Sequence, residues 1–189
     1  MEFKIINLQP EHFTELLLFT DQFIGKDYYS LEQINEIYEK SLFLTNNCSF
    51  LLFQNNQLKG IRLSYMPTKW HSVKGTAGLS PDKWEGISIK QLGYFQSLFI
   101  HPDLTKQHWG PVLSNLSLQE MQKAGALGVL THCWMESPHN SSRRYLEKLG
   151  FNLIQKHNLY WHKVDYECPC CGKPCVCTAG EMLKVMRAK

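Results

Sequence analysis

Residues 98–113 read LFIHPDLTKQHWGPVL. It contains the end of an apolar run and then a polar loop, and the helical pattern SNLSLQEMQKAGA (114–126) follows it directly. A strand, a loop and a helix in this order bring the free backbone N–H groups of the helix start together, which suits a phosphate. The loop holds a single glycine, Gly110, beside His108, Trp109 and Pro111. By itself it therefore fits either an anion site or a solvent loop anchored by Trp109.

The composition sets the broad class of protein. The chain has 189 residues, of which 43% are apolar and 20% charged, which suits one globular domain with a small appendage. A net charge of +3 without a basic block argues against a nucleic-acid partner. The first residues lack the pattern of a signal peptide, and the run LLLF (16–19) is too short for a membrane span. We expect a cytoplasmic protein without a membrane partner, and the sequence leaves its oligomeric state open.

The periodicity along the chain predicts a mixed sheet. Strands alternate with helices from residue 92 to residue 164, which indicates an α/β protein, and an early hairpin makes the sheet mixed. Residues 67–90 are irregular, and Trp70 and Trp84 favour a packed loop there. The expected elements are strand 3–7, helix 9–24, a helix from Ser30, a hairpin around 54–57, strand 92–101, helix 111–124, strand 127–137, a helix within 140–151 and one or two strands within 152–164.

This order of elements resembles the GNAT superfamily of N-acetyltransferases over residues 3–164. Pro102 and Gly110 fall on the proline and the second glycine of the family's phosphate loop, whereas Thr105 and His108 replace its Arg/Gln and its first glycine. The resemblance implies an α/β (α+β) fold, with a mostly antiparallel, twisted, mixed sheet and helices on both faces. It also implies that acetyl-CoA binds along the strand and the loop, at Leu98, Phe99, Ile100, Lys106, Gln107, His108, Trp109, Gly110, Pro111 and Val112.

A second stretch, SRRYLEKLGF (142–151), is similar to the family's fourth-helix motif. Tyr145 lies five residues before Gly150, where many members carry a tyrosine that protonates the departing coenzyme A. The resemblance adds Ser142 to the cofactor contacts, together with Asn140, which is one position out of register. From the residues alone, a core-facing position on the helix is the better interpretation of Tyr145.

The resemblance implies direct transfer of an acetyl group from acetyl-CoA to a small-molecule or peptide amine. Backbone N–H groups at residues 98–100 would stabilise the oxyanion, and Tyr145 would donate the proton to the thiolate. Glu136 is the expected general base, with alternatives at His132, Glu85 and His139 or in a water relay. Trp70, His71 and Trp84 are candidate walls for the acceptor, with interior packing as the alternative. Two other readings stay open: a transferase that uses another acyl-CoA, and a GNAT-fold binding or metal-responsive module with little catalysis.

Seven cysteines divide into two groups. Cys48 and Cys133 stand alone in apolar stretches and are expected to be buried. The other five lie within CPCCGKPCVC (168–177), which contains the Cys-Pro-x-Cys-Gly knuckle of zinc sites. The expected ligands are Cys168, Cys171, Cys175 and Cys177, with Cys170 or His162 as substitutes.

Zinc is the leading metal for this cluster. An iron–sulfur site, a redox dithiol and reduced thiols are the alternatives. We expect a GNAT-like domain over residues 1–164 and a cysteine-rich appendage over residues 165–189. Thr178 and Glu181 form a capping-box pattern, which predicts a last short helix that ends at basic residues, Lys184, Arg187 and Lys189.

Overall fold

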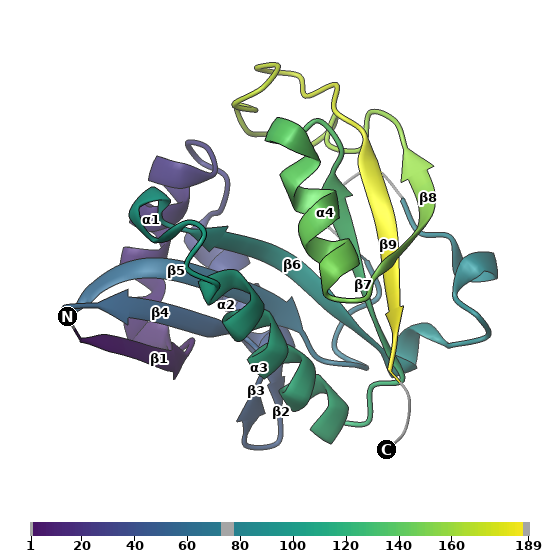
Figure 1. Cartoon of the computed structure of the whole chain (residues 1–189), viewed down its shortest axis with the longest axis horizontal. Coiled ribbons are helices and arrows are strands. Elements are labelled where there is room, and N and C mark those ends of the chain that lie inside the picture. The colour runs from purple at the N-terminus through teal and green to yellow at the C-terminus, as the bar shows by residue number, and fades with distance from the viewer. Residues whose placement is uncertain (1, 73–77, 187–189) are drawn as a thin grey trace.

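The computed structural model describes residues 2–72 and 78–186. A seven-stranded sheet forms its centre, and four α-helices pack against it (Figure 1). The elements are β1 Phe3–Asn7, α1 Phe13–Phe23, α2 Leu31–Ser41, β2 Leu42–Phe43, β3 Asn46–Asn47, β4 Phe50–Gln54, β5 Gln57–Tyr65, β6 Leu92–Ile100, α3 Trp109–Lys123, β7 Gly128–Trp134, α4 Ser141–Lys148, β8 Asn152–His157 and β9 Ala179–Val185.

The sheet is mixed, with the order β1-β4-β5-β6-β7-β9-β8. Only β6 and β7 run parallel, and the other neighbours in this sheet are antiparallel. The predicted hairpin is confirmed as β4 and β5, joined at the turn after Gln54. The expected fold class, mixed and mostly antiparallel with helices on both faces, is therefore confirmed.

Strands β6 and β7 pair over a short distance and then separate. Their parallel register covers only Leu92–Phe95 against residues 128–131. A bulge follows at once, because Leu63 pairs with Ser97 and Ser64 pairs with Phe95, which leaves Gln96 as the extra residue of β6. Figure 1 shows the two strands diverging beyond this point. The edge of β6 that faces β7 is thus free of strand pairing over residues 96–100.

The helices cover both faces of this split sheet. α1 and α2 pack on one face of β5, while α3 packs on β4, β5 and β6 from the other side and α4 packs on β7. The α2 start was predicted correctly, since Ser30 and Gln33 form a reciprocal capping box. α3 begins at Trp109, two residues before the predicted start, and Pro111 is tolerated in its first turn because no intrahelical acceptor awaits its nitrogen. Each helix in the described part of the chain is too short or too polar to cross a bilayer.

The predicted last helix is wrong. Residues 179–185 form β9, which lies between β7 and β8 and pairs with both. The capping-box reading failed because Thr178 donates its backbone N–H to Glu136 and Glu181 is fully buried within a strand. Residues 152–164 supply one strand, β8, followed by turns. Of the basic residues expected at the helix end, Arg187 and Lys189 lie outside the described residues.

We predict that a chain ending at residue 164 does not fold. It lacks β9, so β7 and β8 lose their common partner and Met182 and Leu183 leave the core. Circular dichroism during heating should show no cooperative transition, whereas a chain ending at residue 186 should melt like the full-length protein. A cooperative melt of the 1–164 chain would contradict the placement of β9.

Candidate active site

A cavity of about 580 Å³ lies where β6 and β7 separate. Residues 96–99 of β6 and Thr131, His132 and Trp134 of β7 form its two sides. α4 and Arg62 of β5 border one end, and the end of α1 and the segment between β8 and β9 border the other. The cavity therefore reaches from one face of the sheet to the other through the gap in strand pairing.

The lining of the cavity is largely aromatic and carries little charge. Phe23, Tyr28, Trp134, Trp161 and Tyr166 contribute rings to it. Among the described residues that line it, Arg62 is the one Lys or Arg side chain and no Asp or Glu takes part. A ligand with several positive charges would find no carboxylate partner on these walls.

On the α4 side, Tyr145 belongs to a hydrogen-bonded chain that runs from Arg62 to the Gly110 carbonyl. Its hydroxyl lies 2.6 Å from Ser114 Oγ and donates to the Gly110 carbonyl at 2.9 Å. Ser114 in turn accepts the Arg62 Nε–H at 3.0 Å. Arg62 is 3% exposed and lies over the Phe95 ring, with burial lowering its pKa from the ordinary value and Tyr145 opposing that shift. A buried guanidinium thus stands behind the hydroxyl that faces the cavity.

The loop of residues 105–108 lies at the start of α3. His108 occupies the N-cap position with φ 64°, the left-handed conformation that glycine adopts without strain. Gly110 is buried, and a Cβ there would lie 3.4 Å from both Leu98 and Tyr145. The first backbone N–H groups of α3 have no intrahelical acceptor. Lys106, Gln107 and His108 are exposed, and the loop lies outside the lining of the cavity.

The other predicted site residues divide by position. Leu98, Phe99, Ser142 and Tyr145 line the cavity together. Ile100 and Asn140 lie outside its lining, Asn140 as the exposed N-cap of α4.

Of the candidate bases, only His132 lines the cavity. Glu136 is exposed and accepts the Thr178 N–H, although its neighbours Trp134 and Ser137 reach the cavity. Glu85 and His139 are exposed as well.

The two tryptophans of the irregular segment are interior residues. Trp70 and Trp84 are 2% and 3% exposed and pack in the main core. Trp70 donates to the Leu92 carbonyl and Trp84 donates to Glu181, both at 2.8 Å. The interior-packing alternative is confirmed for both side chains, while His71 is exposed. Residues 73–77 of this segment lie outside the described residues.

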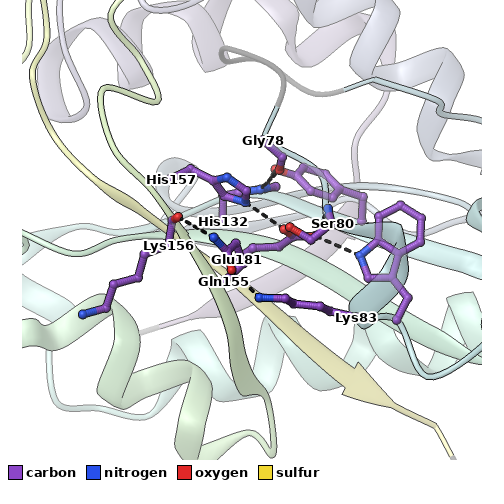
Figure 2. Close-up of polar contacts among 10 residues, drawn as sticks. Gly78, Ser80, Lys83, His132, Gln155, Lys156, His157 and Glu181 are labelled. Carbon is purple, nitrogen blue, oxygen red and sulfur yellow. Dashed lines mark hydrogen bonds and ion pairs between the residues drawn. The ribbon is translucent and has the colours of Figure 1, made fainter.

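Glu181 on β9 is a fully buried carboxylate at the centre of a polar network (Figure 2). One oxygen accepts from Trp84 Nε1 at 2.8 Å and from the Ser80 N–H at 3.2 Å. The other pairs with His157 Nε2 at 2.8 Å. Burial alone would raise the pKa of Glu181, but the hydrogen bonds from Trp84, His157 and Ser80 outweigh it and hold the pKa below its usual value.

His132 lies between this network and the cavity. Its ring nitrogens contact the Tyr94 hydroxyl, at 2.9 Å, and the Gly78 carbonyl, and the ring stacks on Tyr160. Burial lowers its pKa to about 4, against the opposing effect of Glu181. His132 is therefore neutral near pH 7 and has both nitrogens engaged.

The cysteine segment brings four sulfur atoms together. The Sγ atoms of Cys168, Cys171, Cys175 and Cys177 all lie within 4.8 Å of one another. These are the four residues predicted as ligands, and Cys170 is exposed outside the group. Cys48 and Cys133 are buried, as predicted. Cys168 and Pro169 reach the lining of the cavity.

Sequence reasoning missed several residues of the site. Arg62 is a single charge inside the apolar run GIRLSYM, a pattern that signals a partnered interior charge. Glu181 is likewise the one acid within AGEMLKV. The aromatic residues Tyr28, Trp161 and Tyr166 carry no local signal, because only the tertiary fold brings them to one cavity.

No protein-family model matches the sequence, and no curated protein matches it. Solved structures do match. The ribosomal-protein-S18-alanine N-acetyltransferase from Escherichia coli is 13% identical, with a TM-score of 0.68 over 100% of this chain and 96% of that chain. An acetyltransferase of the GNAT family from Streptococcus pneumoniae is 13% identical, with a TM-score of 0.64 over 98% and 100%. The chain has the GNAT fold.

A third neighbour, Arabidopsis thaliana Naa50, was solved with the bisubstrate analogue CoA-Ac-MVNAL. It is 12% identical to this chain, with a TM-score of 0.66, and the match covers 98% of this chain and 100% of Naa50. At identities this low, the structural similarity establishes the shared GNAT fold alone. The chemistry depends on the residues of this chain.

We predict that His132 makes the folded state sensitive to acid. The unfolded chain binds a proton at this histidine near pH 6.5, whereas the folded chain binds it only near pH 4. The free energy of unfolding should therefore fall as the pH drops through this window, by up to about 1.4 kcal/mol per pH unit from this group. Urea unfolding from pH 7.5 to 4 measures the effect. His132→Gln should flatten the profile, and the same substitution at the exposed His71 should not. Equal profiles for His132→Gln and the parent would contradict the assignment.

We also predict that His108→Gly stabilises the protein. Glycine relieves the left-handed strain at this N-cap, which should raise the free energy of unfolding by about 0.5–1 kcal/mol. Thr105→Gly is the matched control, because Thr105 has φ −60° and glycine there relieves no strain. It adds freedom to the unfolded chain and removes the hydrogen bond from Thr105 Oγ1 to the Pro102 carbonyl. In chemical denaturation without ligand, the free energy of unfolding should rise in His108→Gly and fall in Thr105→Gly. A lower free energy of unfolding in both variants would contradict the claim that His108 is strained.

Proposed function

We propose that the protein is an N-acetyltransferase, which moves the acetyl group of acetyl-CoA directly to a primary amine. The observation that carries the proposal is one cavity that holds both the unpaired edge of β6 and the Tyr145 hydroxyl. The GNAT fold supports it, because coenzyme A is part of the analogue bound to the similar Naa50.

Acetyl-CoA would bind along the free edge of β6, near Leu98, Phe99 and Ile100. Its pantetheine amides would take the strand hydrogen bonds that β7 leaves unmade after Phe95. The pyrophosphate would face the first turn of α3, where the backbone N–H groups of Trp109 and Gly110 lack intrahelical acceptors. Pro111 has no N–H, and Val112 already donates to the His108 carbonyl. Lys106, Gln107 and His108 are exposed beside that turn and add a charged donor and polar groups. Ser142 and Asn140 extend the same surface at the start of α4.

The chemical step needs two proton movements. The amine nitrogen attacks the thioester carbon, a backbone N–H of β6 stabilises the oxyanion, and the C–S bond breaks as the carbonyl re-forms. Tyr145 would turn its hydroxyl proton from the Gly110 carbonyl to the departing thiolate and regain a proton from solvent. Arg62, acting through Ser114, favours the tyrosinate that exists in between.

The proton of the attacking amine would leave through water to Glu136. This carboxylate lies between Trp134 and Ser137, which both line the cavity. His132 is the weaker choice, because a pKa of about 4 makes it a poor proton acceptor near pH 7.

The acceptor would enter from the aromatic end of the cavity. Tyr28, Trp161 and Tyr166 offer ring surfaces there, and the described lining contains no acid. An amine attached to an apolar group, such as a small arylalkylamine or a peptide with an apolar first residue, suits these walls better than a polyamine. The peptide part of the analogue bound to Naa50 supports the peptide alternative.

Calorimetry with acetyl-CoA followed by an amine screen tests this function. We expect binding at micromolar acetyl-CoA and a kcat that falls by about 10²-fold or more in Tyr145→Phe, with acetyl-CoA affinity retained. Tyr38→Phe is the matched control, because its hydroxyl contacts Gln9 on α2's side of the sheet. If the folded protein does not bind acetyl-CoA, the proposal is refuted and a binding or metal-responsive module is favoured. If the protein prefers a longer acyl-CoA, it is a different acyltransferase.

A further inference from the structure

We propose that Cys168, Cys171, Cys175 and Cys177 form a closed tetrathiolate Zn²⁺ site whose role is to build the acceptor wall of the cavity. Three sulfur pairs set the geometry. Cys171 and Cys177 are 3.6 Å apart, Cys171 and Cys175 3.8 Å, and Cys168 and Cys177 3.9 Å. A tetrahedron with Zn–S bonds of about 2.3 Å has sulfur–sulfur edges of about 3.8 Å. Disulfides, with sulfur atoms about 2.05 Å apart, do not fit these separations.

The backbone is shaped for the same purpose. Cys168 and Gly172 exchange two backbone hydrogen bonds, of 3.2 and 2.9 Å, which closes a tight turn around the first two sulfurs. Gly172 has φ 72°, a conformation that a residue with a side chain rarely adopts.

Donors are also directed at the sulfur atoms. The Val176 N–H donates to Cys171 and the Tyr166 hydroxyl donates to Cys175. Such hydrogen bonds stabilise thiolates, the form in which cysteine binds metal.

A second group of potential ligands, His132, His157 and Glu181, is a poorer metal site. Its ligand atoms also lie within 4.8 Å of one another. Glu181, however, already receives hydrogen bonds on both oxygens, and both nitrogens of His132 have partners. This group is satisfied as a hydrogen-bonded network, whereas three of the sulfur pairs lie at the spacing of a tetrathiolate metal site.

The sulfur cluster lies at the border of the cavity. The segment between β8 and β9 passes across the open end of the gap between β6 and β7 (Figure 1). Cys168 is a member of the sulfur group, and with Pro169 it lines the cavity. The ring of Tyr166 contacts Tyr28, with centroids 5.2 Å apart, and a Cβ at Gly25 would lie 2.9 Å from the Glu167 carbonyl.

The metal would therefore hold one wall of the acceptor end against the segment that follows α1. This role rests on the proposed acetyl transfer, whereas the metal site itself does not. Zn²⁺ with four thiolates has no open position, so it orders the wall and takes no part in the chemical step.

The first test measures metal on the full-length protein, without any assay of activity. Protein purified under reducing conditions should contain one zinc per chain, and Co²⁺ added to the metal-free chain should give the visible absorption of a tetrathiolate site. Cys171→Ser should lose the zinc. It should also weaken Co²⁺ binding by more than roughly 10- to 100-fold, which is the loss expected when only a hydrogen bond to a metal ligand is removed. Cys170→Ser, at the exposed neighbouring position, should keep both. Equal metal content in the two variants, or disulfides among these cysteines in fresh protein, would overturn the site.

The second test separates the wall from the catalytic step. Removal of zinc, or Cys171→Ser, should raise KM for the amine severalfold and leave KM for acetyl-CoA and the acetyl-CoA affinity unchanged. An equal rise in both KM values, or unchanged kinetics after complete loss of zinc, would overturn the role. If the protein binds zinc and shows no acetyl transfer, the metal site stands and the proposed function fails.

Discussion

The short parallel pairing of β6 with β7 is the constraint on which the rest of this structure depends. Four residues on each strand hold the two halves of the sheet together, and the bulge at Gln96 then turns β6 away. If β6 and β7 stayed paired along their whole length, the gap between them would close and the cavity would be lost. Because the pairing stops at Phe95, a polar strand edge borders a cavity inside the protein, with Tyr145 at one end and aromatic rings at the other. Residues 96–100 are half-buried, and either water or a ligand can satisfy the hydrogen-bonding groups along this unpaired edge.

The second half of the sheet depends on β9, which links β7 to β8. Glu181 fixes this strand to the irregular segment before β6 through Trp84 and Ser80, so a buried carboxylate joins parts of the chain about a hundred residues apart. The cysteine segment leaves the sheet at β8 and returns at β9. Both of its ends are therefore held, and a metal bound by the four sulfurs would order the loop between them at little further entropic cost.

Local patterns predicted the elements that local interactions form. The capping box at Ser30, the turn after Gln54 and the helix that ends before Gly150 each depend on residues close together in sequence. β9 was missed because its capping-box pattern is also local, whereas its strand state is imposed by pairing with β7 and β8. The four sulfur positions followed from the spacing of the knuckle. The cavity did not, since Arg62, Tyr28 and Trp161 meet only through tertiary contacts and no periodicity records them.

Hydrogen exchange at the backbone amides of β6 shows whether acetyl-CoA occupies the unpaired edge of this strand. On addition of acetyl-CoA, we expect slower exchange within residues 97–100, where pairing with β7 has ended, while Leu92–Phe95 change little because β7 already pairs with them. A cofactor that binds without protecting residues 97–100 would contradict the claim that the open edge of β6 is the acetyl-CoA site.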